Sequence, residues 1–227
     1  SILTRRIVKK RINFSGKIVL EEKAVEAGSV MDACLTMIEP EMEKKNLQFS
    51  LSKSIINPYV YMDTTVVTEI ILNIVSNSIK YTADGGKIDC TIRQIDDCQE
   101  GYFTQIFTVS DTGIGMTEEF QKHIFEAFTR ERNSTTSGIE GTGLGMGIVK
   151  KLVDMLGGTI LMQSKVGVGT TFTIKIPTRI ARYEDTQPKQ IAVNDVNSVL
   201  VGKRVLLAED NDLNAEIAIE LLAVYLH

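Results

Sequence analysis

The fold of this sequence can be predicted from one spaced polar motif, Glu69-x-x-x-Asn73-x-x-x-Asn77-x-x-Lys80-Tyr81. Its first four polar residues follow one another at steps of four, four and three, which places them on one face of a helix. The same helix carries a separate apolar stripe, formed by Val66, Ile70, Ile74, Val75 and Ile79. Asparagines inside an apolar helix are costly unless their amides are paired, so this face predicts a polar pocket.

Three glycine-rich blocks follow this helix along the chain. They are Asp111-Thr-Gly113-Ile-Gly115, Gly141-Thr-Gly-Leu-Gly-Met-Gly147 and Gly167-Val-Gly169-Thr170-Thr171-Phe172, with Ile124-Phe-Glu-Ala-Phe128 between the first two. Glycines let a backbone approach a ligand closely, and backbone N–H groups at the start of a helix bind anions. Each block alone could be chance, but all of them in this order indicate a nucleotide pocket. The P-loop is excluded, because no G-x-x-x-x-G-K-[ST] motif occurs.

These blocks resemble the N, G1, F, G2 and G3 boxes of the ATP-binding domain of sensor histidine kinases. The domain type is the Bergerat fold, which Hsp90, the type II topoisomerases and the MutL proteins share. The resemblance covers about residues 15–178. It implies an α/β fold, a two-layer α/β sandwich in which a mixed sheet carries helices on one face. It also implies that the cofactors are ATP and Mg²⁺, with ATP and ADP as the bound nucleotides.

Asp111 and the glycines after it form the candidate base-binding block. A carboxylate at the end of an apolar strand can accept a hydrogen bond from the exocyclic amine of adenine. Gly113 and Gly115 let the backbone turn beside the base, and Met116 completes the block. An Asp-x-Gly turn without a binding role is the ordinary alternative. The resemblance adds Thr170, which is expected to support the base slot.

The helix supplies the candidate metal and phosphate ligands. Asn73 offers a neutral oxygen to Mg²⁺, which keeps several waters and needs few protein ligands. Asn77 lies one turn further on, Lys80 is a point charge suited to a phosphate, and Tyr81 can stack on adenine. Amides paired with the backbone, a solvated lysine and a core tyrosine are the alternatives. The resemblance assigns Glu69 to acid–base or orienting work, with a surface glutamate as the alternative, so the catalytic candidates are Glu69, Asn73 and Lys80.

A phosphate lid is expected around the polar segment 129–140, which has few groups to bury and precedes an apolar helix. The residues expected to anchor this lid or to bind phosphate through it are Phe128, Gly141, Thr142, Gly143, Leu144 and Gly145.

Composition narrows the class of protein. The chain has 227 residues, enough for one core plus a fragment, and its net charge of −4 argues against nucleic-acid binding. No apolar run reaches membrane-spanning length, so we expect no membrane contact from this stretch, although a longer parent chain could carry an anchor. Cys34, Cys90 and Cys98 lack metal-ligand spacing, which favours buried reduced thiols and a cytoplasmic location.

Four segments are expected along the chain. By resemblance, residues 1–16 are the tail of a dimerisation helix and residues 17–178 are the ATP-binding domain. Residues 179–201 are polar and aperiodic, as in a linker. Residues 202–227 begin with an apolar strand that ends in Glu209-Asp210, which resembles the start of a receiver domain.

Hydrophobic periodicity predicts the elements of the ATP-binding domain. Strands are expected at 47–51, 59–62, 87–96, 102–110, 159–165 and 170–176. Helices are expected from Ser29, from Asp63 or Thr64 to Tyr81, from Thr117, and at 143–156. Ser29-Val-Met-Asp32 has the form of a capping box, and Lys44-Lys45 suits the dipole at the end of that first helix.

The expected phosphoacceptor is absent from the sequence. Its two histidines, His123 and His227, both lie outside any upstream dimerisation helix. We therefore expect Mg-ATP binding and transfer of the γ-phosphate to a histidine of the protein's own dimerisation domain, beyond this fragment, in a homodimeric bacterial hybrid kinase. A receiver domain or response regulator would be the next partner. The alternatives are a hydrolytic ATPase of the Hsp90 or MutL type and a non-catalytic nucleotide-binding module.

Overall fold

The structure is a computed structural model that describes residues 19–97, 99–126 and 145–187. The chain divides into two compact units, Ser1–Thr186 and Gln187–His227, and the fold described below is that of the first. The expected dimerisation-helix tail (1–16) and receiver fragment (202–227) lie outside the described residues.

The centre of the domain is a five-stranded mixed sheet with the strand order β2-β4-β5-β7-β6. Its strands are β2 (Gln48–Ser54), β4 (Lys87–Asp96), β5 (Tyr102–Asp111), β6 (Thr159–Lys165) and β7 (Gly169–Arg179). β2 runs parallel to β4, and the other neighbouring strands are antiparallel. Each strand overlaps a stretch where alternating apolar residues predict one.

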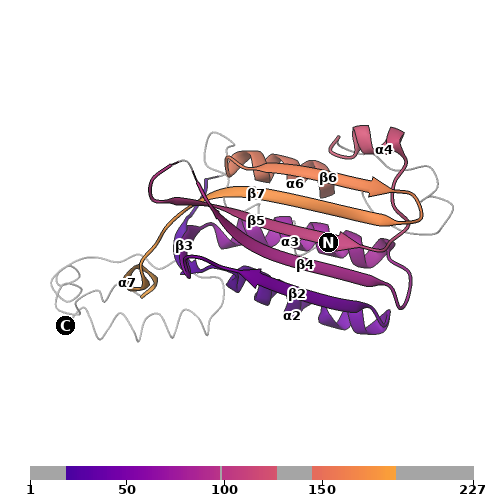
Figure 1. The fold of residues 1–227 in the computed structure, drawn as a ribbon, viewed down its shortest axis with the longest axis horizontal. Coiled ribbons are helices and arrows are strands. Elements are labelled where there is room, and N and C mark those ends of the chain that lie inside the picture. The colour runs from indigo at the N-terminus through magenta and orange to yellow at the C-terminus, as the bar shows by residue number, and fades with distance from the viewer. Residues whose placement is uncertain (1–18, 98, 127–144, 188–227) are drawn as a thin grey trace, which may run out of the picture. The chain divides into compact units, whose positions relative to one another are not determined.

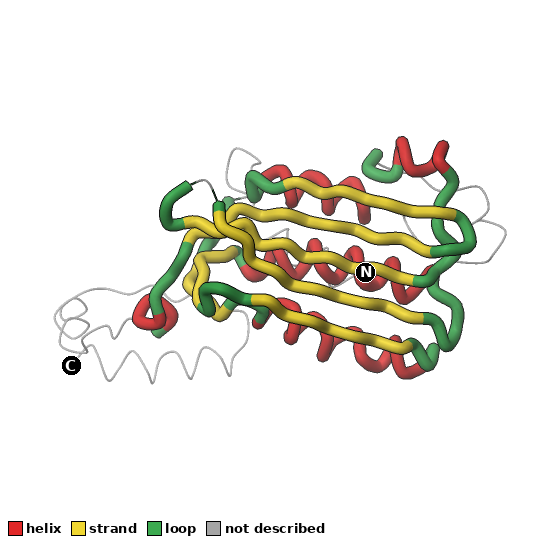
Figure 2. Tube along the Cα trace, viewed as in Figure 1, coloured by secondary structure: helices red, strands yellow, loops and turns green. Residues whose placement is uncertain are grey.

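Three helices cover one face of this sheet, as Figures 1 and 2 show. They are α2 (Ser29–Lys44), α3 (Thr64–Tyr81) and α6 (Gly145–Met155), and α3 lies between the other two. Two short helices, α4 (Glu118–His123) and α7 (Tyr183–Thr186), lie at the ends of the sheet. This arrangement confirms the expected two-layer α/β fold with helices on one face.

The core lies between the helices and the facing side of the sheet. Alternate residues of β4, Ile88, Cys90 and Ile92, are almost fully buried, and the apolar stripe of α3 packs in the same cluster. The other side of the sheet is mainly polar, with Thr91 and Thr108 paired across β4 and β5. One covered face and one largely polar face explain why sequence alternation predicts these strands well.

A two-stranded ribbon lies beside the main sheet, formed by β1 (Lys23–Glu26) and β3 (Tyr59–Met62). The chain after β7 joins this ribbon, because Ile180 pairs with Val60 and the Ala181 N–H donates to the Tyr59 carbonyl at 3.0 Å. The chain between residue 178 and α7 is therefore part of the compact unit, although its composition resembles that of a linker.

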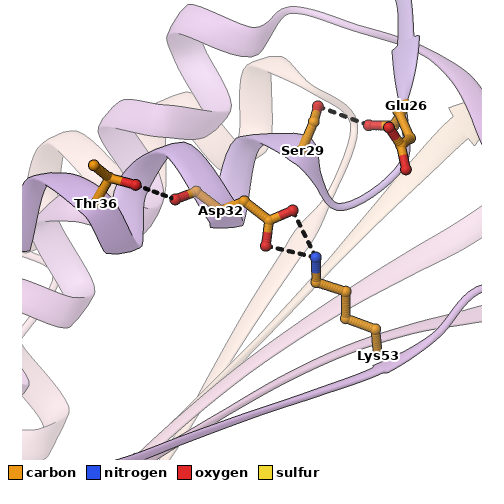
Figure 3. Close-up of polar contacts among 5 residues, drawn as sticks. All are labelled: Glu26, Ser29, Asp32, Thr36 and Lys53. Carbon is orange, nitrogen blue, oxygen red and sulfur yellow. Dashed lines mark hydrogen bonds and ion pairs between the residues drawn. The ribbon is translucent and has the colours of Figure 1, made fainter. Parts of the chain in front are cut away.

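The start of α2 differs from the predicted capping box (Figure 3). The N-cap residue is Gly28, at φ 96°, and no side chain caps the helix. Ser29 Oγ donates to the Glu26 carbonyl, and both carboxylate oxygens of Asp32 accept from Lys53 Nζ of β2 at 2.5 and 2.6 Å. The prediction of a capping box is wrong. The Asp32 carboxylate binds the Lys53 ammonium on β2 and caps no backbone N–H group at the start of the helix.

Two of the cysteines are free and buried, as predicted. Burial raises the pKa of the Cys34 thiol to about 11 and that of Cys90 to about 12. Both therefore stay protonated at neutral pH and pack as small apolar side chains. Cys98 lies outside the described residues.

Candidate functional site

The polar face of α3 is fixed at the start of the helix. The Asp63 side chain caps the helix by accepting from the Val66 N–H at 3.1 Å, and it also accepts from the Glu21 N–H at 2.8 Å. Further along, Glu69 is buried and Asn73 and Asn77 are half-buried. The sequence predicts this polar face correctly, because the helical period alone determines it.

Asn73 and Asn77 both point toward the start of α6. The Asn73 amide nitrogen donates to the Glu69 carbonyl at 2.8 Å, and its Oδ1 lies beside Gly145, where an added Cβ would be 3.1 Å away. Asn77 Nδ2 donates to the sulfur of Met146 at 3.4 Å, a weak acceptor. The two amides therefore line the junction at which α6 begins.

The Asn73 oxygen fits a single protein ligand for Mg²⁺. It accepts no hydrogen bond from a described residue, and Mg²⁺ binds through few protein oxygens while phosphates and waters fill the other positions. Among the described residues, no group of three or more His, Cys, Asp or Glu could hold a metal ion. These residues therefore offer no cage of carboxylates.

Glu69 is buried near this junction, with 6% of its surface exposed. Its carboxylate has no hydrogen-bond partner within the described part of the chain, and burial raises its pKa above the usual range. A carboxyl group in this state can take up a proton more readily than an exposed glutamate.

Asp111 receives three hydrogen bonds at the other end of α3. Ser78 Oγ donates to its Oδ2 at 2.8 Å, and the N–H groups of Gly113 and Thr170 donate to its Oδ1 at 2.9 and 3.2 Å. Burial raises the Asp111 pKa, and these three donors lower it in part. The carboxylate is thus held from α3, from the loop after β5 and from β7.

The loop after β5 passes too close to its neighbours for any residue but glycine. A Cβ on Gly113 would lie 2.7 Å from the Tyr81 carbonyl oxygen, and one on Gly115, at φ 68°, would lie 2.0 Å from the Lys165 carbonyl oxygen. The Gly167 N–H donates to the Ile114 carbonyl at 2.8 Å, which ties this loop to the β6–β7 turn. These contacts bring the first and last glycine-rich blocks together.

We expect Gly115→Ala to destabilise the domain by about 3 kcal/mol, as both a left-handed backbone and a direct clash must be relieved. Gly167→Ala is the matched control, since Gly167 has φ 75° but no atom within 4 Å of its added Cβ. Backbone strain alone should cost it about 1 kcal/mol. Urea denaturation of both variants measures the difference, and equal losses would contradict the close approach at Gly115.

Lys80 and Tyr81 lie next to each other at the end of α3. The Lys80 ammonium is 4.9 Å from the centre of the Tyr81 ring, a cation–π distance. The Tyr81 carbonyl accepts from the Ile114 N–H at 3.2 Å. Met116 is half-buried, and its carbonyl accepts from the Gln121 side chain at 2.9 Å. Lys80 and Tyr81 therefore lie at the Asp111 end of α3, and Met116 follows Gly115 in the loop after β5.

Two residues of this site were not predicted from the sequence. Ser78 is one, because a serine inside a helix gives no signal of what it contacts. Lys45 is the other, and its ammonium donates to the carbonyls of Ile79, Lys80 and Thr82 at 2.8, 3.4 and 2.5 Å. Lys45 therefore stabilises the end of α3. Its place in the sequence predicts instead that it interacts with the dipole at the end of α2.

Much of the expected lid lies outside the described residues. That holds for Phe128, Gly141, Thr142, Gly143 and Leu144. Gly145 is described, as the first residue of α6 next to Asn73. His123 is exposed on α4, where its Nδ1 lies 2.9 Å from the Glu126 carboxylate. No helix of the described residues is long and apolar enough to cross a membrane.

Comparisons with known proteins agree with this geometry. Residues 62–180 match the family described as histidine kinase-, DNA gyrase B-, and HSP90-like ATPase. The chain is 31% identical over 207 residues to the autoinducer 2 sensor kinase/phosphatase LuxQ of Vibrio cholerae, covering 89% of this chain and 24% of LuxQ. It is 32% identical over 212 residues to the signal transduction histidine-protein kinase BarA of Escherichia coli, covering 92% of this chain and 22% of BarA. The chain thus spans less than a quarter of the length of these curated relatives.

Solved structures agree on the fold. The catalytic domain of histidine kinase ThkA superimposes with a TM-score of 0.59 at 24% identity, covering 70% of this chain and 96% of that domain. Full-length ShkA in complex with AMPPNP gives a TM-score of 0.62 at 24% identity, covering 92% of this chain and 40% of ShkA.

Proposed function

This chain belongs to the histidine kinase-, DNA gyrase B-, and HSP90-like ATPase family, and from that premise we propose that it binds Mg-ATP and presents the γ-phosphate to a histidine outside this sequence. The observation that supports this most is that α3 presents two different polar groups at two places along its length. One end of the helix holds the hydrogen-bonded Asp111 carboxylate, and Asn73 directs at the start of α6 an oxygen that accepts no hydrogen bond from a described residue.

The Asp111 end is the proposed base slot. An ionised carboxylate that already accepts three hydrogen bonds can still accept one from the exocyclic amine of adenine. Gly113 and Gly115 keep the loop close to Tyr81 and to the end of β6. Thr170 positions Asp111 through its N–H, and Tyr81 and Met116 provide neighbouring surface.

The Asn73 end is the proposed phosphate and metal site. When bound there, Mg²⁺ would neutralise charge on the phosphates and orient the γ-phosphoryl group. Asn73 would supply the protein oxygen, with Asn77 as a donor to phosphate oxygens. Lys80, which lies at the Asp111 end of α3, would leave the Tyr81 ring to reach the phosphates. Glu69, whose pKa burial raises, would orient the attacking histidine or accept its proton. The glycines at 141–145 would add backbone N–H groups at the helix start.

The partners and cellular setting are part of the same proposal. The relatives named above are sensor kinases that are much longer than this chain, so the acceptor histidine is proposed to lie in a preceding dimerisation domain of a homodimeric bacterial parent. A receiver domain or response regulator would take the phosphoryl group next. We also propose the segment order 1–16, 17–178, 179–201 and 202–227 given above, with the first residues of the linker, up to α7, packed within the compact unit. A cytoplasmic location for this part of the parent belongs to the same proposal.

The test is phosphoryl transfer. The chain is incubated with Mg²⁺ and radiolabelled ATP, alone and with a longer version of the same protein that includes the preceding helices and carries Asp111→Asn. We expect no label on the chain alone, label on the longer acceptor that is stable to base and labile to acid, and little release of free phosphate. Steady phosphate release without a labelled acceptor would contradict the kinase and support the hydrolytic ATPase instead. ATP binding, measured by calorimetry, with neither a labelled acceptor nor phosphate release would support the non-catalytic nucleotide-binding module.

A further inference from the structure

Ser78 occupies a buried position on α3 between the proposed phosphate and base ends. Only 2% of its surface is exposed. A serine inside a helix usually bonds its hydroxyl back to the carbonyl four residues earlier, or to water. Ser78 instead donates across to Asp111 Oδ2, a residue 33 positions further along the chain, at 2.8 Å. The hydroxyl is therefore committed to the carboxylate.

The position of Ser78 is itself fixed by the end of the helix. Its carbonyl accepts from the Thr82 hydroxyl at 2.6 Å and from the Thr82 N–H at 3.0 Å. Lys45 Nζ in turn donates to the Thr82 carbonyl. Ser78 can therefore keep its hydroxyl in one place relative to Asp111.

The hydrogen bonds around Asp111 favour one protonation state. Two of its donors, the N–H groups of Gly113 and Thr170, cannot accept a proton in return, so Oδ1 must remain an acceptor. Ser78 occupies Oδ2 as a third donor. Without it, a buried carboxyl group could hold a proton on Oδ2 and donate it to a ligand.

We propose that Ser78 is a positioning residue that keeps Asp111 an acceptor only, and thereby makes the pocket select a base with an exocyclic amine over one with a carbonyl at the same position. This rests on the proposed function. Adenine and hypoxanthine are the matched pair, because they differ in the amine or carbonyl at one carbon and in the proton on the neighbouring nitrogen. An ionised Asp111 can accept from the amine but repels the carbonyl oxygen, whereas a protonated Asp111 could donate to it.

The sign of the pH effect follows from the same contacts. Burial raises the Asp111 pKa and the Ser78 hydrogen bond lowers it, so loss of the hydroxyl raises it further. Adenine binding needs the ionised form and is lost as pH falls through that pKa. On the elements packed around Asp111, the ionisable side chains nearest in sequence to its contacts are Lys80 and Tyr81 of α3, Lys87 of β4 and Lys165 of β6. Asp111→Asn, which has no carboxyl group to titrate, reports the pH dependence that these other groups contribute.

The experiment is a calorimetric titration of the full chain with non-hydrolysable analogues of adenosine and inosine triphosphate, in Mg²⁺, from about pH 5 to about pH 8. Ser78→Ala tests the hydroxyl, because alanine keeps the helix. Ser76→Ala is the matched control, since Ser76 is exposed on the same helix and donates only to a backbone carbonyl. Ser78→Thr keeps a hydroxyl and serves as the conservative variant, and thermal unfolding checks that each variant is folded.

We expect Ser78→Ala to weaken binding of the adenosine analogue about tenfold at neutral pH. The pH midpoint of its binding should rise by about one unit, and its preference for adenosine over inosine should fall about tenfold at the acidic end. Ser76→Ala should match the unmutated chain, and Ser78→Thr should keep the unmutated midpoint. If Ser78→Ala leaves midpoint and preference unchanged while the unmutated chain binds the adenosine analogue, the role of Ser78 is overturned and the proposed function stands. If the unmutated chain binds neither analogue, the proposed function is overturned, and this inference with it.

Discussion

Replacing Asp111 with asparagine should weaken binding of a non-hydrolysable ATP analogue about a hundredfold, close to 3 kcal/mol. Asparagine has one acceptor oxygen and one donor group in place of two acceptors. The pocket presents Ser78 as a donor on one side and the Gly113 and Thr170 N–H groups on the other. The amide can keep its oxygen toward the Gly113 and Thr170 N–H groups and donate its NH₂ group to the Ser78 hydroxyl, which can also accept. The second acceptor oxygen, which the adenine amine would use, is then replaced by a donor. Calorimetry with Mg²⁺ present measures the change.

The stability of this variant separates a binding defect from a folding defect. Burial raises the Asp111 pKa in the folded state, so folding favours the protonated carboxyl group and the domain gains stability from it as pH falls through that pKa. The neutral asparagine should therefore unfold no more easily than the unmutated chain at neutral pH. Asp96→Asn, an exposed change of the same charge at the end of β4, should bind the analogue normally. If Asp111→Asn binds the analogue as tightly as the unmutated chain does, Asp111 does not bind the base.

Asn73→Ala is expected to reduce phosphoryl transfer to the longer acceptor about a thousandfold, because it removes the oxygen proposed to hold Mg²⁺ on the phosphates. Analogue binding in Mg²⁺ should fall to the level measured with excess chelator, and binding without Mg²⁺ should change little. This pattern assigns the defect to the metal, because loss of the Asn73–Glu69 backbone contact would weaken binding in both conditions.

The control for this variant is again Ser76→Ala, which changes the exposed side of the same helix. It should transfer phosphate at the unmutated rate and keep the full effect of Mg²⁺ on binding. An Asn73→Ala protein that still binds the analogue more tightly with Mg²⁺ would show that another group holds the metal.

The elements that follow a strict period were predictable from sequence. Three strands agree with the structure to the residue, at 59–62, 87–96 and 159–165. They could be predicted because more buried and more exposed side chains alternate along each of them. The spacing of the first motif also predicts the polar face of α3. The family resemblance predicts that Thr170 lies near Asp111. The strand β1 was not predicted, because its two apolar residues, Ala24 and Val25, are adjacent and lie between charged residues, so the segment shows no alternation.

The contacts that refine the site were not predictable, because they join residues far apart in sequence. Ser78 reaches Asp111 across 33 positions, and Asp32 meets Lys53 across 21. In both cases the residue type suits a local role equally well, as a solvated serine or as part of a capping box. Long-range pairing decides between such roles, and one sequence contains no signal for it.

The contact of Lys45 with the end of α3 limits how the protein can change in length. Connections between elements usually tolerate insertions and deletions, since they lie on the surface. Residues 45–47 connect α2 to β2, and the Lys45 ammonium must reach three carbonyl oxygens of another helix from there. An added or deleted residue in this short connection would pull the lysine away from the helix that carries the pocket.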